Sequence, residues 1–302
     1  MFLTGATGYI GSAVAEALER AGHSVIGLAR SEEKARELES RHIRARRGDL
    51  LKPETVVEAT RVAGGVIHTA NTNDANAAQV DTAVVRAILK ALENTGRPFI
   101  YTSGVWVLGS TAGKVANEQS PVNPPMLVAH RPGLEQEVLT YKDRGVRAIV
   151  IRPADVYGRG GGLLSMLSQS ARQSGAARYV GNGENRWALV HVDDLAQLYL
   201  LALEKAPAGS IYVAASGPSC SVRGLAEAAS IGAGAHGKAE SWPLDEARKT
   251  LGPLVDGLVL DQQVSGEKAR RELGWNPKTP SVLDDLRAGS YASAGRAGSG
   301  RA

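Results

Sequence analysis

At 302 residues the chain can bury a large core in one large domain or two unequal ones. The net charge of +4 comes from 35 Lys and Arg against 31 Asp and Glu, and the two signs are interspersed, so no nucleic-acid partner is indicated. The single Cys220 offers no disulfide framework and no cysteine metal site, and no apolar run reaches the roughly 18–20 residues of a membrane span. We expect a cytoplasmic protein with no metal and no membrane partner.

The first half of the chain alternates short β-rich runs with helical patterns. Strands are predicted at 2–5, 24–30, 43–49, 64–70, 98–104 and 146–153, and helices at 9–22, 31–40, 53–61, 75–96 and 134–145. This regular alternation favours a parallel sheet with helices on both faces. We predict an α/β fold, a Rossmann-type doubly wound parallel sheet, in which the basic run 41–49 forms a solvated strand edge.

After Pro153 the pattern loosens. Residues 178–192 predict two short strands around an Asn-Gly turn, and residues 193–206 predict an amphipathic helix. We expect residues 1–155 to bind a dinucleotide and residues 156–287 to form a smaller α+β substrate-binding part, interleaved with the first. Residues 288–302 are rich in small residues without periodicity, which predicts a disordered tail.

The most informative stretch is "TGATGYIG", residues 4–11. It follows a strand and opens a helix. Gly5 permits a tight turn, Gly8 lets the backbone approach a pyrophosphate, and Gly11 allows the helix to pack against the strand. The free N–H groups at the helix start would then bind the anion.

This G-x-x-G-x-x-G spacing resembles the short-chain dehydrogenase/reductase superfamily, particularly its extended, epimerase-like branch. The resemblance covers residues 1–287 and includes "GDL" (48–50), "VIHTA" (66–70), "YTSGVWVLG" (101–109), "RPADVYG" (152–158) and "VHVDDLA" (190–196). It implies the same fold and a nicotinamide cofactor.

The end of the second strand indicates which cofactor form is bound. An NAD-selective site places an acid there, whereas this chain places Arg30, followed by Ser31. A guanidinium suits a 2′-phosphate, so NADP(H) is favoured and NAD(H) stays open. From the motif and the resemblance, we expect the cofactor to be bound by Gly5, Thr7, Gly8, Tyr9, Ile10, Gly11, Arg30, Ser31, Asp49, Leu50, Thr69, Ala70, Asn71, Thr102, Arg131 and Pro153.

The catalytic positions of the superfamily carry other residues in this chain. Relatives have a serine or threonine after the fifth strand, then a Tyr-x-x-x-Lys pair. Alignment sets Gly104 in the serine position, with Ser103 one residue early, and sets Leu127 and Arg131 in the tyrosine and lysine positions. The nearby Tyr141 lies too deep in the helix to replace the tyrosine.

Three residues are candidate proton donors instead. His130 could act or simply lie at a helix start, Tyr157 could act or pack under the glycine loop, and Ser103 could act or point elsewhere. For substrate contact we expect Trp106 and Arg186.

Three functions therefore compete. The first is an NADP(H)-dependent oxidoreductase acting on a small carbonyl, imine or activated alkene with a non-standard proton donor. The second is a net non-redox epimerase, dehydratase or isomerase that keeps its cofactor. The third is a non-catalytic NADP(H)-binding regulator. A homodimer is left open.

Overall fold

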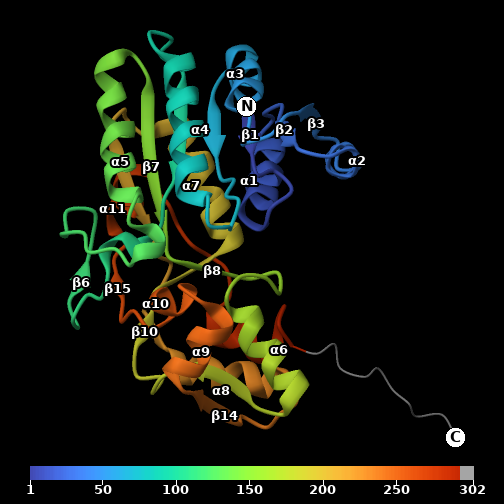
Figure 1. Ribbon diagram of the computed structural model, residues 1–302, viewed down its shortest axis with the longest axis vertical. Coiled ribbons are helices and arrows are strands. Elements are labelled where there is room, and N and C mark those ends of the chain that lie inside the picture. The colour runs from blue at the N-terminus through green and yellow to red at the C-terminus, as the bar shows by residue number, and fades with distance from the viewer. Residues whose placement is uncertain (293–302) are drawn as a thin grey trace, which may run out of the picture.

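A parallel sheet of seven strands runs through the larger part of the molecule (Figure 1), and the structure, a computed structural model, describes residues 1–292. The strand order is β12-β7-β5-β4-β1-β2-β3, so the chain reverses direction across the sheet between β1 and β4. The predicted doubly wound sheet is confirmed. Its strands are β1 (Phe2–Thr4), β2 (Ile26–Ala29), β3 (Arg44–Arg47), β4 (Val66–His68), β5 (Pro98–Thr102), β7 (Arg147–Pro153) and β12 (Ser210–Ala214).

Helices cover both faces of this sheet. Neighbouring strand residues point to opposite faces, as Phe2 and Leu3 do when they join separate buried clusters. This two-sided burial explains why the central strands are hydrophobic throughout. One face is covered by α1 (Tyr9–Arg20), α2 (Glu32–Ser40) and α7 (Val192–Lys205), the other by α3 (Pro53–Val62), α4 (Ala77–Leu92) and α5 (Arg131–Thr140).

The basic strand β3 forms one edge of the sheet. Three of its four residues are exposed, and Arg46 pairs with Glu58 while Arg47 pairs with Glu32. The predicted solvated edge is confirmed, since these charges remain in water.

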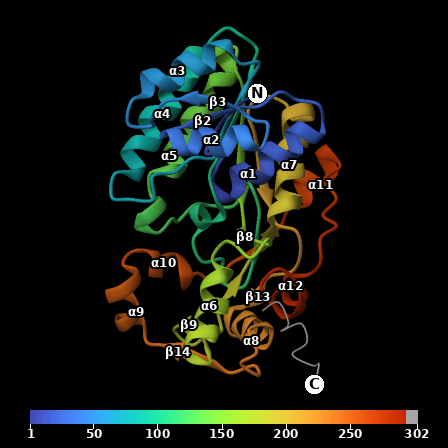
Figure 2. The same cartoon turned by 90° about the vertical axis from the view of Figure 1, so that its right-hand side faces the viewer.

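The smaller part gathers at the end of the molecule remote from the N-terminus (Figures 1 and 2). Its helices are α6 (Leu164–Ser174), α8 (Val222–Gly232), α9 (Leu244–Leu251), α10 (Leu254–Leu258) and α12 (Val282–Ala288). Its paired strands are β8 (Asp155–Tyr157) with β11 (Leu189–His191), β9 (Ala177–Val180) with β14 (Ala239–Trp242), and β10 (Arg186–Trp187) with β13 (Cys220–Ser221). The parts are interleaved in sequence, because β12 and α11 (Glu267–Leu273) return to the larger one.

Short elements complete the connections. A strand pair, β6 (Val115–Ala116) with β15 (Gln263–Val264), joins the loop after β5 to the C-terminal half. The 3-10 turns are η1 (Val105–Leu108), η2 (Met126–Val128) and η3 (Tyr141–Arg144).

The strands predicted on either side of the Asn-Gly turn in residues 178–192 are present, but they do not pair with each other. Gly183 does adopt the turn conformation, with φ +73°. However, β9 pairs in parallel with β14, and β10 pairs antiparallel with β13. The turn is local, but the flanking strands find partners that are distant in sequence.

The predicted disordered tail needs correction over its first residues. Tyr291 is buried, its hydroxyl accepts a hydrogen bond from the Gly158 N–H at 2.8 Å, and it donates to the Gly161 carbonyl at 2.5 Å. One large ring thus anchors a stretch whose neighbours are small. The remainder of the predicted tail, residues 293–302, lies outside the described residues.

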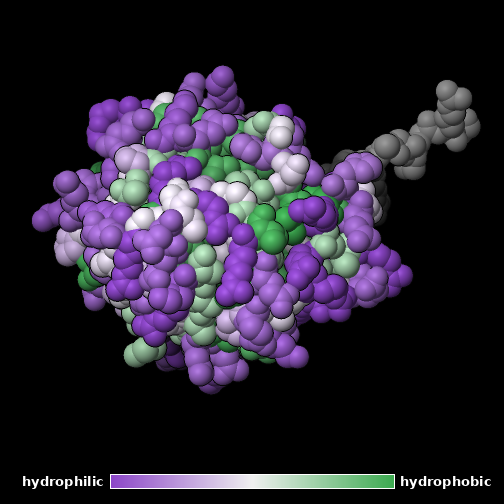
Figure 3. Space-filling model, turned by 90° about the horizontal axis from the view of Figure 1, so that it is seen from above, coloured by the Kyte–Doolittle hydropathy of each residue, from purple (hydrophilic) through white to green (hydrophobic). Residues whose placement is uncertain are grey.

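The surface seen from above relative to Figure 1 is mostly hydrophilic, with small separate hydrophobic areas (Figure 3). Across the described part of the chain, no helix combines the length and the apolar character that a membrane span requires.

A buried ion pair joins the end of β7 to α5. The Arg152 guanidinium donates two hydrogen bonds to the Glu135 carboxylate, Nε to Oε1 at 3.0 Å and Nη2 to Oε2 at 2.5 Å. The two side chains are 3% and 0% exposed. This pair fixes the helix that carries Arg131 against the strand that leads into Pro153.

We predict that Glu135→Ala lowers the free energy of unfolding by about 3–5 kcal/mol, because it leaves the Arg152 charge buried and unpaired. Urea denaturation measures the loss. Asp256→Ala is the matched control, since it breaks the exposed Arg248–Asp256 pair and should change stability far less. Equal losses in the two variants would contradict this account.

Candidate active site

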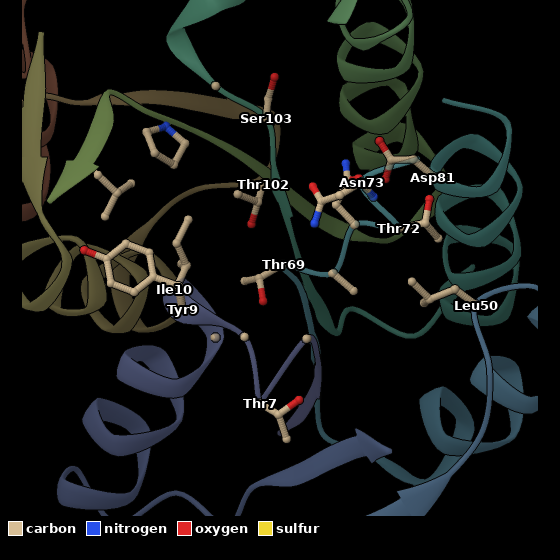
Figure 4. Close-up of a pocket in the computed structure, with 18 of the residues that line it drawn as sticks. Thr7, Tyr9, Ile10, Leu50, Thr69, Thr72, Asn73, Asp81, Thr102 and Ser103 are labelled. Atoms are coloured by element: carbon tan, nitrogen blue, oxygen red, sulfur yellow. The ribbon is translucent and has the colours of Figure 1, made fainter. Parts of the chain in front are cut away.

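A single cavity of about 920 Å³ lies at the carboxyl ends of the parallel strands, at the switch point between β1 and β4. Ligands of open α/β sheets bind at this place. Figure 4 shows that the loop after β1, the ends of β4 and β5, and α4 face this volume.

The glycine loop of the cavity depends on close backbone contacts. Gly5 has φ +75°, and a Cβ there would lie 2.8 Å from Thr69 Oγ1 and 2.9 Å from the Ala70 nitrogen. A Cβ on Gly11 would lie 2.0 Å from the Gly5 carbonyl oxygen. Only glycine therefore lets α1 begin this close to β1 and β4.

The start of α1 suits an anion. Gly8 is its N-cap, no side chain caps the helix, and its first turn holds no acidic residue. The first amides of the helix and its positive dipole end are thus available to a diphosphate. These residues fit a nicotinamide dinucleotide.

One end of the cavity carries two basic side chains. Arg30 and Lys34 both line it, together with Asp49, Leu50 and Leu51. Arg30 is exposed and makes no ion pair within residues 1–292. Ser31 is not among the lining residues, because its hydroxyl caps α2 by accepting the Lys34 N–H at 3.2 Å. Sequence reasoning missed Lys34, although it lies one helical turn after Arg30.

The middle of the cavity is formed by the loop after β4. The predicted Thr69, Ala70 and Asn71 line it, and so do Thr72, Asn73 and Asp74, which the sequence analysis did not select. The Thr69 hydroxyl donates to the Thr4 carbonyl at 2.8 Å, which ties β4 to β1.

A buried polar cluster is centred on Asp81, which also lines the cavity. Its carboxylate accepts from the Tyr101 hydroxyl at 2.7 Å and contacts His68 Nε2 at 3.1 Å and His130 Nε2 at 3.3 Å. Burial opposes ionisation, but the hydrogen bonds of His130 and His68 outweigh it and hold the pKa of Asp81 well below its ordinary value. The structure therefore directs the His130 side chain to Asp81, and His130 is not among the residues that line the cavity.

The end of β5 presents two hydroxyls that point in opposite directions (Figure 4). Thr102 Oγ1 lies 2.6 Å from the Tyr199 hydroxyl. Ser103 is 4% exposed, lines the cavity, and its Oγ has no hydrogen-bond partner in the described chain. Arg131 Nη1 donates to the Ser103 carbonyl oxygen at 2.9 Å.

Two further residues line the cavity beside Ser103. Trp106 Nε1 donates to Asp155 Oδ1 at 3.1 Å. The indole packs against α10, because a Cβ on Gly257 would lie 2.2 Å from the ring. Burial raises the pKa of Asp155 to about 7, although the hydrogen bond from Trp106 works in the other direction. Sequence reasoning missed Asp155, whose signal was a carboxylate two residues after the end of a buried strand.

Two predicted residues lie elsewhere. The Tyr157 hydroxyl donates to the Pro280 carbonyl at 2.9 Å, and its ring meets His191 edge-on. Arg186 forms an ion pair with Asp261, Nε to Oδ1 at 3.1 Å. Neither residue is among those that line the cavity. Within residues 1–292 there is no cluster of side chains suited to hold a metal.

The doubly wound sheet, the glycine loop and the uncapped start of α1 define a Rossmann-type dinucleotide-binding protein. The chain belongs to the NAD dependent epimerase/dehydratase family, whose model matches residues 1–215. The family resemblance drawn from the sequence is thus confirmed, and a nicotinamide cofactor and enzyme activity on small molecules are shared properties of this group.

The matches to individual relatives cover nearly the whole chain. An uncharacterised protein of Saccharomyces cerevisiae is 36% identical and covers 95% of this chain and 98% of its own length. A 2-alkyl-3-oxoalkanoate reductase of Stenotrophomonas maltophilia is 27% identical, with 95% and 97% covered. The crystal structure of the Thermus thermophilus UDP-glucose 4-epimerase in complex with NAD matches this chain with a TM-score of 0.79 and 21% identity. The match covers 95% of this chain and 98% of the epimerase chain, which shows that the two share a fold.

The raised pKa of Asp155 makes stability depend on pH. In the unfolded chain an aspartate loses its proton near pH ~4. The folded protein keeps that proton until about pH 7, so stability falls as pH rises through this interval and levels off above it.

We predict that Asp155→Asn removes this pH dependence. The melting temperature of the variant relative to the wild type should rise between about pH 4 and 7 and stay constant above. The difference between a pKa near ~4 in the unfolded chain and about 7 in the folded protein sets an upper limit of about 4 kcal/mol, which water in the cavity reduces. Thermal melts at constant ionic strength measure the difference, and parallel curves for the two proteins would contradict the raised pKa.

Proposed function

We propose that this protein is an NADP(H)-dependent reductase of the atypical short-chain type, acting on a small carbonyl, imine or activated alkene with a non-standard proton donor. The observation that carries the proposal is the make-up of one cavity. The glycine loop and the start of α1 form part of its wall, Arg30 and Lys34 lie after β2, and Ser103, Trp106 and Asp155 lie after β5 and β7.

The preference for the phosphorylated cofactor rests on Arg30 and Lys34. Both line the cavity beside Asp49, and Arg30 is exposed with its guanidinium available. A 2′-phosphate would gain charge-assisted hydrogen bonds from such a pair, whereas a ribose hydroxyl would gain little.

We assign the other parts of the cofactor to residues in the order in which these residues line the cavity. We assign the diphosphate to the residue 5–11 loop, the adenine to Asp49 and Leu50, and the ribose path to Thr69, Ala70 and Asn71. We assign the nicotinamide end to Thr102, Arg131 and Pro153. These residues line the cavity at the end of β5, the start of α5 and the end of β7. When bound, the reduced dinucleotide supplies a hydride.

Among the three candidate substrate classes (carbonyl, imine and activated alkene), a carbonyl, specifically a ketone, is favoured. The relative from Stenotrophomonas maltophilia, whose alignment spans 97% of its length, is named as a reductase of a 3-oxoalkanoate. At 27% identity the relation supports the reaction type and leaves the substrate's side chains unspecified.

A net non-redox reaction is the second candidate, because the family includes epimerases and dehydratases. A regulator that binds NADP(H) without turnover is the third. The cytoplasmic location and the homodimer stay predictions of the sequence.

Turnover separates these functions. The purified protein is mixed with NADPH and a panel of 3-oxo acids and esters, simple ketones, imines and activated alkenes, while the absorbance of the reduced cofactor is followed. We expect steady consumption of NADPH with at least one ketone. Gly11→Ala is the control, since its Cβ would meet the Gly5 carbonyl and spoil the dinucleotide site. Product without net cofactor change would favour the non-redox enzyme, and binding without turnover would favour the regulator.

We predict that Arg30→Ala weakens NADPH binding roughly 10- to 100-fold and leaves NADH binding nearly unchanged, because the lost contact is with the 2′-phosphate. Fluorescence titration with each dinucleotide measures both affinities. Arg36→Ala is the matched control, an exposed arginine on α2, the helix that follows Arg30, and it does not line the cavity. Equal weakening of both dinucleotides would refute the selective role of Arg30.

A further inference from the structure

We infer that Asp155 is the acid that protonates the substrate in this site, and that Trp106 is the residue that positions its carboxyl group. The inference rests on the proposed reductase function and names the proton donor that this function requires.

The three donors suggested by the sequence fit this role less well. The side chains of His130 and Tyr157 are engaged with Asp81 and with the Pro280 carbonyl, and neither lines the cavity. Ser103 does line the cavity, but its hydroxyl has no neighbouring base and no other described partner from which to draw a proton. The Ser103 Oγ is also buried, so another group has to supply the proton.

The position of Asp155 is set by its backbone. The Asp155 N–H donates to the Ala188 carbonyl at 2.9 Å, and the Ala154 N–H donates to the Ala214 carbonyl at 2.9 Å. Asp155 thus begins β8 two residues after Pro153, at the end of the cavity opposite to Arg30. Asp155 lines the same cavity as Ser103 and Arg131.

The hydrogen bond from Trp106 distinguishes the two carboxyl oxygens. Trp106 Nε1 donates to Oδ1, so that oxygen acts as an acceptor. Oδ2 makes no hydrogen bond with the described residues, so it is the oxygen free to carry a proton toward the cavity. The indole is itself held against Gly257 of α10, which keeps the donor in place.

The charged groups around Asp155 leave its pKa in a range that suits an acid. The titratable or charged side chains that line the cavity are Tyr9, Arg30, Lys34, Asp49, Asp74, Asp81 and Arg131, while His191 on the paired strand β11 packs against Tyr157 of β8. No described residue forms an ion pair with the Asp155 carboxyl group. Burial is therefore the main influence and raises its pKa to about 7, close to the value that suits an acid at neutral pH.

The reaction balances with one hydride and one proton. Reduction of a ketone adds a hydride, supplied by the reduced dinucleotide, to the carbonyl carbon. The carbonyl oxygen takes the proton from Asp155 Oδ2, whose O–H bond breaks as the alcohol O–H bond forms. The product is the alcohol with oxidised dinucleotide, and the Asp155 carboxylate regains a proton from water.

The test compares Asp155→Asn with the matched control Asp256→Asn, which changes an exposed carboxylate outside the cavity. For the best ketone of the panel, we expect kcat/KM of Asp155→Asn to fall roughly 10²- to 10⁴-fold. The affinity for NADPH should be unchanged, and Asp256→Asn should match the wild type. In the wild type, kcat/KM should decline as pH rises above about 7, because the acid form of Asp155 is lost.

Trp106→Phe provides a second test, in which the pH profile of kcat/KM should move in one stated direction. The hydrogen bond from Trp106 lowers the pKa of Asp155, so its removal raises that pKa and moves the decline of kcat/KM to higher pH. This outcome differs from a general loss of activity, which would lower the whole profile without shifting it.

A readout without turnover uses the indole itself. Fluorescence of the wild type in complex with NADP⁺ should show a transition near pH 7 that is missing in both Asp155→Asn and Trp106→Phe. Absence of this transition from the wild type would overturn the inference.

The outcomes separate the two proposals. Ketone reduction by Asp155→Asn within threefold of the wild type, or an unshifted profile for Trp106→Phe, refutes Asp155 as the acid and leaves the reductase standing. If the wild type binds NADPH and reduces nothing in the panel, the reductase fails and the proton-donor role fails with it. Should Asp155→Asn not fold, the profile of Trp106→Phe decides.

Discussion

The cavity depends on the contact between Gly11 and the Gly5 carbonyl, where α1 begins against β1. A Cβ at Gly11 would lie 2.0 Å from that oxygen, and a Cβ at Gly5 would lie 2.9 Å from the Ala70 nitrogen at the end of β4. Helix and strands can meet only because no side chain separates them. This approach brings the first amides of α1 to the switch point of the sheet, so that the anion site and the ends of β4, β5 and β7 share one volume.

The smaller part of the molecule is attached to both ends of this volume. At the start of α1, the Tyr9 hydroxyl donates to the Gly158 carbonyl at 2.7 Å, and the Gly158 N–H donates to the Tyr291 hydroxyl. At the opposite end, Trp106 packs against Gly257 of α10. The smaller part therefore contacts the cavity wall at two places, Trp106 and Tyr9. The two parts form one site even though their strands do not share a sheet.

The sequence predicted those features that depend on local patterns. Alternating strands and helices indicated the doubly wound sheet, and the glycine spacing located the diphosphate loop, because both patterns reflect contacts close in the chain. Pairings between distant segments escaped prediction, as β9 with β14 shows. The same limit applies to the site: Arg30 could be selected from its place after a strand, whereas Asp155 acquires its character from Trp106, 49 positions earlier, and from enclosure by several elements. The buried position of Tyr291 was not predicted, because a segment judged by its composition of small residues gives little weight to one aromatic ring.

The environment of Asp155 explains how a carboxyl group can replace a phenol as the acid. A tyrosine starts from a pKa near ~10 and becomes a better donor when a cation lowers it, whereas an aspartate starts near ~4 and must be raised by apolar enclosure. A guanidinium beside Asp155 would lower its pKa and keep the carboxylate ionised, so the group could not donate a proton. Arg131 stands at the position that alignment assigns to the family's lysine, yet it donates to the Ser103 carbonyl, and the polar partner of Asp155 is an uncharged indole N–H. Because Arg131 is directed to that carbonyl and forms no ion pair with Asp155, burial remains the main influence on the pKa of Asp155.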